Sequence, residues 1–570
     1  MDFLKERLAK IFRDAVSAAG FDPPAGAELV RPSDRPDLSD FQSNVALALG
    51  KIEGSNPRAV AESIAANIKD GGVRVSVDGP GFINMTLDNG FVAEAVAETI
   101  AAPDFGVEKA SDPKNIVVDY GGPNVAKALH VGHLRPAVIG EALIGLARFK
   151  GHRVTGDAHL GDWGLPMGML IAAIKEKNLP LPVDVDALNR LYPEASRRSK
   201  EDEEFMSRAR EETKKLQDGD AENRRIWKSF VAPSVEGMRK IYDSLLVRFD
   251  LWLGESDADP FVRELIPRFR AGGFTRMSDG AEIIDLSGYP MNGAPVPPFI
   301  MVKSNGAVMY GMTDVATLYD RVENMKADMV WYVAGTPQAL HFHQVFSVAK
   351  ITGIAGGASF EHLGNGSVLG SDGKPFKTRS GDTAKLEDLV SDALALARKR
   401  VGESAKELGA AEAESVARAV AVAAIKFADL VNPRASDYVF DLDKFVSFEG
   451  KTGPYVLYTA VRIKSMLANF PDADTAAKVV IANGCDKALA MKICGFAGAL
   501  DKAFDARAVH VLVQYAYELA VVFSAFYHRC SVLREEDAAL RKSRLALSAA
   551  TLGIFEIFAD IIKIEIPERM

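Results

Sequence analysis

The stretch NIVVDYGGPNVAKALHVGHLRPAVIGEALIGLARFKG (115–151) decides the fold class of this protein. It begins with a short apolar run (115–120), is broken by the turn-forming GGPN, and continues with apolar residues at helical spacing as far as Gly151. A similar strand–turn–helix pattern occupies 328–353, where DMVWYVAG and TPQ precede a second helical run. Alternating strands and helices predict a parallel sheet covered by helices, the architecture of a Rossmann-type α/β domain.

Regions of different character flank this pattern. Residues 1–108 alternate helical patterns with short β-like runs and end in a polar, turn-rich linker, which predicts a small α/β N-terminal domain. We expect the Rossmann-type domain to cover 109–395, with a helical insertion at about 175–230. Its charged segment 194–225 contains both signs at close spacing, which is typical of an exposed helix with i,i+4 ion pairs. Helical periodicity over 396–570 predicts an all-α C-terminal domain.

Composition and charge restrict the class of protein. The chain has 570 residues, of which 48% are hydrophobic and 25% charged, so disordered, collagen-like and coiled-coil classes are excluded. Its net charge of −9 means that a nucleic-acid partner would need a local basic surface. Three cysteines without C-x-x-C spacing exclude a disulfide framework and a thiolate zinc site. With no signal-peptide pattern and no uncharged apolar run of about 20 residues, we expect a cytoplasmic protein without a membrane span.

Two histidines, His130 and His133, stand where the first strand has ended and its helix begins. A helix N-terminus presents unpaired backbone N–H groups and the positive end of the helix dipole, and both favour a bound phosphate. Gly132 leaves room for a phosphate to approach the backbone, and Lys127 adds a cation three residues before the first histidine. The turn therefore predicts a nucleotide site in which the imidazoles donate hydrogen bonds to phosphate oxygens.

The histidine pattern alone leaves two alternatives open. In the first, one histidine is packed and the other is exposed, and neither has a functional role. In the second, the pair binds a metal ion whose third ligand is His152, His159 or Asp157, although the sequence offers no thiolate to support such a site.

A second basic loop, LGSDGKPFKTRSGDT (369–383), follows a strand-like run. Lys374, Lys377 and Arg379 are candidates to close over a triphosphate from the side opposite the histidines, whereas in isolation the same pattern is that of a solvated turn. Two cationic loops from two halves of one sheet would hold one pyrophosphate between them. Thr383, at the end of the loop, is expected to be the N-cap of the next helix.

Motifs along the whole chain resemble the arginyl branch of the class I aminoacyl-tRNA synthetases. HVGH is similar to the HIGH signature of the class, and DYGGPNVAKALHVGHLRP (119–136) is similar to its arginyl form, in which an S-P-N-x-A-K stretch precedes the histidines. Further resembling segments are HLGDWGLPMGML (159–170), IYDSLLVRFDLWLGES (241–256), MYGMTDVA (309–316), QALHFHQVF (338–346), EHLGNGSVLGSDGKPFKTRSG (361–381), SDYVFDLDKFVSFEGKTGPYVLY (436–458), FYHRCSVL (526–533) and the terminal IPERM. DFQSNVALALGK (40–51) and GPGFIN (79–84) resemble the N-terminal added domain of that family.

The resemblance implies roles for particular residues. His130, His133 and Lys127 are expected to be catalytic, with Lys127 supplying the charge of a signature lysine whose position is taken by Thr378. The residues expected at ATP are His130, Gly132, His133, His341, Gln344 and Lys377. Those expected at arginine are Asp119, Asn124, Tyr310, Asp314 and Gln338. Asp119 stands where the family has glutamate, and Pro375 where lysine is common.

The guanidinium group of arginine explains why Tyr310 and Asp314 are the expected specificity residues. It is planar with five donors, a carboxylate accepts two of them in parallel, and a tyrosine face or hydroxyl can hold the rest. Gln338 is expected to hold the main-chain end of the amino acid, and His341 and Gln344 to lie on the ATP side.

For tRNA, the resemblance implies contacts from the helical anticodon-binding domain and from the added domain. The residues expected there are Tyr455, Tyr458, Tyr527, Met570 and Phe41, with Asp40 and Gln42 beside Phe41. Splayed bases commonly stack on aromatic side chains. Leu457 stands where glutamine is common in the family.

The implied function is that of an arginine–tRNA ligase using ATP with Mg²⁺. Arginine would be activated as an adenylate with release of pyrophosphate and passed to the 2′-hydroxyl of the terminal adenosine of tRNA(Arg). We expect a monomer without a structural metal and without a membrane partner. The alternatives are a metal-dependent hydrolase built on His130, His133, His152 and His159, and a non-catalytic paralogue that binds tRNA; intact histidines, Lys127, Asp314 and Gln338 argue against the latter.

Overall fold

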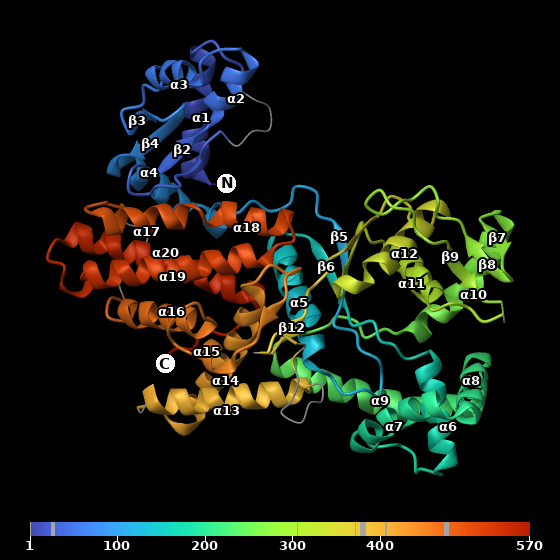
Figure 1. The fold of residues 1–570 in the computed structure, drawn as a ribbon. Helices are drawn as coiled ribbons and strands as arrows, with labels where there is room; N and C mark the ends of the chain where they lie inside the picture. The colour runs from blue at the N-terminus through green and yellow to red at the C-terminus, as the bar shows by residue number, and fades with distance from the viewer. Residues whose placement is uncertain are drawn as a thin grey trace.

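The structure is a computed structural model of the chain. It describes residues 2–23, 29–304, 306–370, 372–374, 376, 384–404, 407–471 and 478–570. Three regions follow one another along the chain: a small N-terminal domain, a central α/β region and a helical C-terminal region (Figure 1).

The N-terminal domain packs helices on an antiparallel sheet with strand order β1-β2-β4-β3. Its strands are β1 (Arg31–Pro32), β2 (Phe41–Ser43), β3 (Val73–Asp78) and β4 (Phe82–Leu87), and its helices are α1 (Phe3–Ala18), α2 (Val45–Ile52), α3 (Pro57–Ala66) and α4 (Asn89–Ala101). The alternation of helices and short strands predicted for the small α/β N-terminal domain is confirmed. The short turn η1 (Pro103–Gly106) leads out of this domain.

A parallel four-stranded sheet with strand order β11-β10-β5-β6 forms the centre of the molecule. Its strands are β5 (Asn115–Tyr120), β6 (Arg153–Asp157), β10 (Met329–Val333) and β11 (Ser359–His362). β5 pairs in parallel with both β6 and β10, which confirms the parallel sheet predicted from the two strand–turn–helix patterns. The carboxyl ends of these strands therefore meet along one edge of the sheet.

Helices and a second small sheet surround the central sheet. After β5 come the turn η2 (Val131–His133) and α5 (Leu134–Phe149). The later elements are α10 (Glu255–Ala271), α11 (Gly311–Glu323), η3 (Thr336–Gln338) and α12 (Ala339–Ile351), with the antiparallel strands β7 (Thr275–Ser278), β8 (Ala281–Ile284) and β9 (Phe299–Val302) between α10 and α11. The sequence analysis did not predict this antiparallel sheet.

Four helices form the insertion that follows β6. They are α6 (Leu165–Glu176), α7 (Val185–Glu201), α8 (Glu203–Asp218) and α9 (Ala221–Ser244). The i,i+4 pairs expected in the charged segment are present, among them Arg198–Asp202 and Lys215–Glu211, with N–O distances of 3.2 and 2.9 Å. In Figure 1 these helices lie together at the end of the molecule opposite the N-terminal domain.

The last third is helical, as predicted, apart from the two-residue parallel pair β12 (Val368–Leu369) and β13 (Tyr438–Val439). Its elements are α13 (Leu386–Ser404), α14 (Ala410–Leu430), α15 (Leu442–Phe445), α16 (Gly453–Leu467), α17 (Gly484–Cys494), α18 (Phe496–Asp505), α19 (Val509–Arg529), η4 (Val532–Arg534) and α20 (Ala538–Ile562). The expected boundary at 395/396 falls inside α13, so we propose that the helical domain begins with that helix. Thr383, the expected N-cap, lies outside the described residues.

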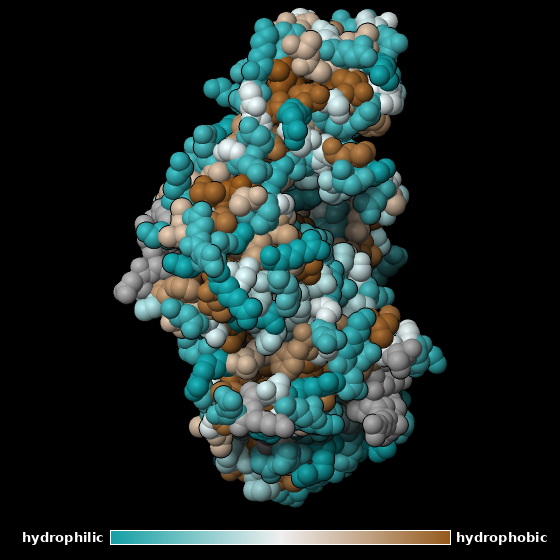
Figure 2. Space-filling model, turned by 90° about the vertical axis from the view of Figure 1, so that its left-hand side faces the viewer, coloured by the Kyte–Doolittle hydropathy of each residue, from teal (hydrophilic) through white to brown (hydrophobic). Residues whose placement is uncertain are grey.

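By length and composition alone, two of these helical segments could cross a membrane: Val509–Arg534 and α20, whose most apolar stretches have mean hydropathies of 1.4 and 1.8. Both carry charged residues, for example Glu518 and Glu556. Half of the apolar stretch of the first and 67% of that of the second are buried against the rest of the chain. On the face shown in Figure 2, hydrophobic residues form separate groups among hydrophilic ones. Both helices therefore serve here as core helices of the helical domain.

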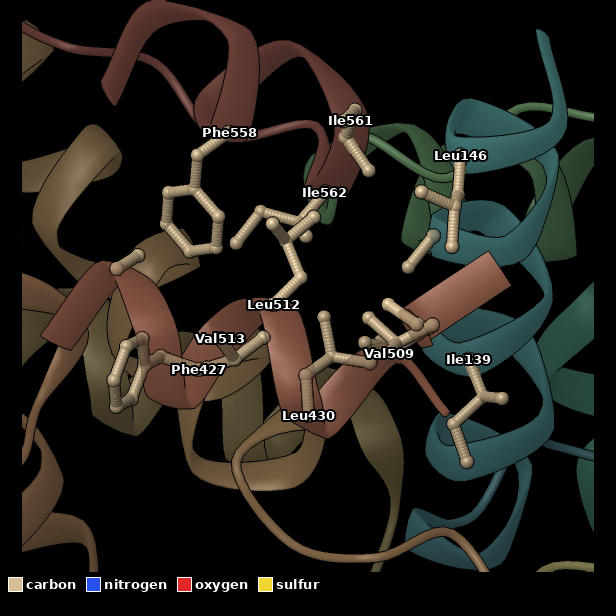
Figure 3. Packing of buried hydrophobic residues seen from close by; sticks show 14 of the residues in the cluster. Ile139, Leu146, Phe427, Leu430, Val509, Leu512, Val513, Phe558, Ile561 and Ile562 are labelled. Carbon is tan, nitrogen blue, oxygen red and sulfur yellow. The ribbon is translucent and has the colours of Figure 1, made fainter. Parts of the chain in front are cut away.

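Helix α5 joins the central sheet to the helical domain. Ile139 and Leu146 of α5 face Val509 of α19 and Ile561 of α20 in the cluster of buried residues shown in Figure 3. Helices α5 and α20 approach closely at Gly145 of α5, where a Cβ atom would lie 2.1 Å from the Ile561 carbonyl oxygen of α20. The helix that follows the two histidines is thus packed between sheet and helical domain, which fixes its N-terminus.

Candidate active site

The two histidines cap each other at the start of α5. His130 is the N-cap of η2; its Nδ1 accepts a hydrogen bond from the Gly132 N–H at 3.1 Å, and the His133 Nδ1 accepts one from the His130 N–H at 3.0 Å. A neutral imidazole that accepts at Nδ1 carries its proton at Nε2, so these bonds assign an Nε2–H donor to each ring. A Cβ atom at Gly132 would lie 2.8 Å from the His130 ring, so glycine is what allows the imidazole to fold back.

Burial keeps both imidazoles neutral. It lowers the pKa of His133 to about 3, with further lowering by the neighbouring His130 and Lys127. The pKa of His130 is also lowered, by burial first and by the Lys127 charge second. The two rings therefore offer neutral hydrogen-bond donors at neutral pH, and the cationic charge of this turn comes from Lys127, which is exposed.

The chain returns to this turn directly after the second basic loop. Val131 N–H donates to the Ala384 carbonyl at 3.0 Å, and Leu386 N–H donates to the Leu129 carbonyl at 2.9 Å. Ala384 and Leu386, which follow the loop, are thereby fixed beside the histidines. That the two loops hold one phosphate chain stays a prediction. Lys377, Arg379, Thr378 and Pro375 lie outside the described residues, and Lys374 is exposed.

Asp119, expected at the arginine substrate, lies at the carboxyl end of β5 and is paired with Arg321 of α11. The Arg321 Nη2 donates to Asp119 Oδ2 and to Asp157 Oδ2, each at 2.7 Å. Desolvation by burial raises the pKa of Asp119, and the Arg321 charge opposes that shift. His159 borders the same group, with its Nδ1 at 3.6 Å from Asp157 Oδ2.

Asp314 and Tyr310, the expected specificity pair, lie together at the start of α11. His341 of α12 joins them: its Nε2 lies 2.8 Å from Asp314 Oδ2, and its ring stacks on Tyr310 with centroids 5.1 Å apart. His341 thus lies beside the pair expected at arginine, and its expected place on the ATP side stays a prediction. Tyr310 is 60% exposed, which leaves its face available to a ligand.

Glu255, which the sequence analysis did not single out, belongs to the same acidic region. Burial raises the pKa of its carboxyl to about 7, and the negative charges of Asp314 and Asp162 add to the shift. Glu255 is the first residue of α10. In the sequence, the one feature that could have identified it is its place in IYDSLLVRFDLWLGES (241–256), a segment that resembles the arginyl family. A carboxyl that is half-buried near Asp314 is well placed to become ionised when a guanidinium group binds.

Of the remaining residues expected at the substrates, Asn124 lies on the loop after β5, Gln338 on the turn after β10 and Gln344 on α12. Asn124 is exposed and pairs through its backbone with Gly161, where a Cβ atom would lie 2.1 Å from Asn124 Oδ1. Gln338 is exposed at the end of η3, directly after β10. Gln344 donates from Nε2 to the Pro297 carbonyl at 2.9 Å. None of these contacts tests the ligand roles, which stay predictions.

The residues expected to contact tRNA divide into exposed and buried groups. Tyr458 is 38% exposed, and the Arg462 guanidinium lies between its ring and that of Tyr527, at 4.6 and 5.1 Å from the ring centroids. Tyr455 is half-buried and its hydroxyl donates a hydrogen bond to Ser524 Oγ at 3.1 Å, and Met570 is half-buried.

The expectation for Phe41 is not supported. Its side chain is 6% exposed in the core of the N-terminal domain, so the ring has no free face for a base. Its neighbour Gln42 is buried as well. Asp40 is bound by Lys487 of α17 at 2.6 Å, so this segment connects two domains. Leu457 is also buried, which leaves no polar contact at the position where the family commonly has glutamine.

His130 and His133 lie side by side, but no third ligand of the metal-site alternative joins them among the described residues. Among the described residues, Asp119, Asp157 and His159 have ligand atoms within 4.8 Å of one another, but this group includes neither His130 nor His133. The Arg321 guanidinium already binds both of its carboxylates. His152 instead accepts from the Lys114 N–H and stacks on Phe504. The site thus has the groups for binding a nucleotide and a cationic amino acid.

Comparison with known families agrees with this arrangement. The sequence profile described as "tRNA synthetases class I (R), catalytic domain" matches residues 96–442, "DALR anticodon binding domain" matches 456–570, and "Arginyl tRNA synthetase N terminal domain" matches 6–87. The fold and the histidine turn are accordingly those of a class I aminoacyl-tRNA synthetase.

Full-length relatives narrow the assignment. An arginine–tRNA ligase of Francisella tularensis subsp. novicida is 41% identical over 100% of this chain and 99% of its own, and one of Hyphomonas neptunium is 39% identical over 100% of both. Arginyl-tRNA synthetases of Plasmodium falciparum (TM-score 0.82, 24% identity, 100% of both chains) and Thermus thermophilus (TM-score 0.80, 23% identity, 99% of this chain and 100% of the other) share the fold. The chain belongs to the arginyl-tRNA synthetase family, ATP-dependent ligases that act on arginine and tRNA.

Proposed function

We propose that this chain activates L-arginine with MgATP at the edge of the sheet formed by β5 and β10. The arginine carboxylate attacks the α-phosphorus of ATP and pyrophosphate leaves; the arginyl group of the adenylate then passes to the 2′-hydroxyl of the terminal adenosine of tRNA(Arg), and AMP is released. Little covalent work falls on the protein, so positioning and charge stabilisation carry the rate. Mg²⁺ arrives with the triphosphate as part of the substrate.

The observation that carries the proposal is that two kinds of groups lie along one edge of the sheet: hydrogen-bond donors beside a cation, and a group of carboxylates. On one side, His130 and His133 present Nε2–H donors next to the Lys127 cation, which suits phosphate oxygens and the charge that develops on the α-phosphate. On the other side, Asp119, Asp314 and Glu255 form an acidic region that suits a ligand with two cationic ends. Arginine is such a ligand, because it carries an α-ammonium and a guanidinium group.

The setting of this reaction follows from the same family relationship. We propose that the enzyme is a cytoplasmic monomer that works without a membrane and without a resident metal ion. We further propose that Tyr458 and Tyr527, which share the Arg462 cation between their rings, stack with anticodon bases. Tyr455 and Met570, both half-buried, would support this surface from behind.

The substitution Asp314→Ala tests the assignment of the guanidinium site. We expect it to reduce kcat/KM for arginine by on the order of 10³-fold, because the guanidinium group loses its carboxylate partner in a partly desolvated site. ATP binding should be unchanged. Aminoacylation of total tRNA with each of the 20 amino acids, together with ATP titration, measures both. Normal arginine kinetics in the variant would overturn the assignment, and charging with a different amino acid would overturn the proposed function.

A further inference from the structure

Arg321 is a fully buried guanidinium inside an enzyme whose substrate carries the same group. Its side chain is 1% exposed, and Nη2 donates to both Asp119 and Asp157. Nε and Nη1 have no hydrogen-bond acceptor among the described residues, and the ring of Tyr332 lies 5.1 Å from the guanidinium carbon. The hydrogen bonds that hold Arg321 therefore all go to two carboxylates.

These carboxylates are neighbours at the ends of two adjacent strands. Asp119 and Asp157 are register partners in the β5–β6 pair. Asp157 is buried, whereas the side chain of Asp119 keeps 19% of its surface exposed. Arg321 binds Oδ2 of Asp119, and the strands fix the backbone beneath it, so the orientation of the remaining oxygen is set by this one contact.

The same helix carries the residue proposed for the other end of the substrate. Asp314 lies in the first turn of α11 and Arg321 lies seven residues later, near its end. At 1.5 Å per residue, seven residues correspond to about 10 Å along the helix axis. Thr317, one turn after Asp314, contacts His159 Nε2 at 3.3 Å, so α11 is held along its length against the strand ends.

We propose that Arg321 is a positioning residue that orients Asp119 toward the α-ammonium group of arginine. Because Arg321 and Asp314 belong to one rigid helix, α11 then fixes the spacing between the α-ammonium site and the guanidinium site. That spacing selects for the length of the arginine side chain. The inference rests on the proposed function, since it assumes that arginine is the amino acid bound here.

The affinities for two ligands distinguish a positioning role of Arg321 from a purely structural role. Arginine has an α-ammonium group, and 5-guanidinopentanoate has the same chain without it. In Arg321→Met, Asp119 loses the partner that orients it, so we expect arginine binding to weaken about tenfold, the effect of losing one charge-assisted contact. Binding of 5-guanidinopentanoate should change less than about twofold, because it makes no contact with Asp119. Isothermal titration calorimetry on the full chain measures both affinities.

The control is a buried arginine far from the site. Arg544 binds Asp486 at 3.1 Å within the helical domain and is as little exposed as a core residue. Arg544→Met should lower stability without changing the ratio of the two affinities. If Arg321→Met does not fold, Arg321→Lys takes its place, since it keeps the cation but loses the planar two-carboxylate geometry. In Arg321→Lys, the ratio of the affinity for arginine to the affinity for 5-guanidinopentanoate should then fall at least threefold.

The outcomes are distinct. Equal weakening of both ligands in the Arg321 variants, or no weakening of either, would overturn the positioning role. Retained discrimination against homoarginine and against 2-amino-4-guanidinobutanoate would overturn the role in selecting chain length, since these ligands are one methylene longer and shorter. If the wild type bound no arginine at all, the proposed function itself would fail, and this inference with it.

Discussion

At the scale of single residues, the site uses burial to set protonation. The imidazoles of His130 and His133 are held neutral, so that they act as directional donors, while burial raises the pKa of the Glu255 carboxyl to about 7, so that it is only partly ionised at neutral pH. Burial lowers the pKa of the imidazoles and raises the pKa of the carboxyl for the same reason, because desolvation disfavours the charged form of each group. The site is therefore less charged when empty than its composition indicates.

The pKa of Glu255 predicts how arginine binding depends on pH. A carboxyl with a pKa of about 7 becomes about tenfold more ionised between pH 6 and pH 8, and the ionised form attracts the guanidinium group. Arginine affinity, measured by calorimetry, should rise about tenfold over this range and level off above it. Glu255→Gln should flatten the profile; an unchanged slope in this variant would assign the pH dependence to another group.

At the scale of elements, α5 connects the candidate active site to the helical domain. Arg135, in its first turn, pairs with Asp429 of α14 at 3.1 Å, and the two side chains are 1% and 0% exposed. Arg135 also donates to the Ser436 carbonyl at 2.6 Å. The N-terminus of the helix that presents the histidines is thus fixed by a buried ion pair to α14 of the helical C-terminal region.

Removal of one partner of this pair should be costly. Arg135→Ala leaves the Asp429 carboxylate buried without its cation, and we expect a loss of about 3–5 kcal/mol in the free energy of unfolding. The double variant Arg135→Ala/Asp429→Ala should recover part of that loss. Thermal unfolding of the four proteins measures the coupling, and simple additivity of the two single effects would show that the pair contributes nothing specific.

At the scale of the whole molecule, Lys426 joins three segments that are distant in sequence. Its ammonium group is completely buried and donates to the carbonyls of Leu246, Ile562 and Lys563 at 3.1, 3.1 and 2.8 Å. These carbonyls belong to the end of the helical insertion and to the end of α20, while Lys426 itself lies on α14. The contact therefore fixes the helical domain to the catalytic region.

Burial lowers the pKa of Lys426 from 10.5 to about 7. The folded protein then holds this proton less tightly than the unfolded chain, so the stability linked to the group is greatest at high pH and is lost as the pH falls through about 7. Lys426→Met should be less stable than the wild type because the buried carbonyls around this side chain lose their N–H donor. The gap between their thermal midpoints should widen from pH 7.5 to 9.5, and a constant gap would contradict the lowered pKa.

Much of this architecture could be predicted from the sequence, because its signals are local. The strand–turn–helix patterns predicted the parallel sheet, and the HVGH motif predicted a turn that brings both histidines to the start of a helix. The role of that turn as a phosphate site stays a prediction. The sheet β7-β8-β9, the pairing of Arg321 with Asp119 and the burial of Phe41 depend on contacts between distant segments, which periodicity does not report. The contact of His341 with Asp314 likewise depends on tertiary packing, and the expected role of His341 at ATP stays a prediction.

The most direct test of the central claim is arginine-dependent exchange between ATP and pyrophosphate, with and without total tRNA. The account predicts exchange that requires arginine and is lost in Asp314→Ala, and we expect the exchange also to require tRNA. Exchange with arginine alone would retain the ligase but remove the expected dependence on tRNA. Folded protein that binds tRNA yet shows no exchange under either condition would contradict the account and favour a non-catalytic tRNA-binding protein.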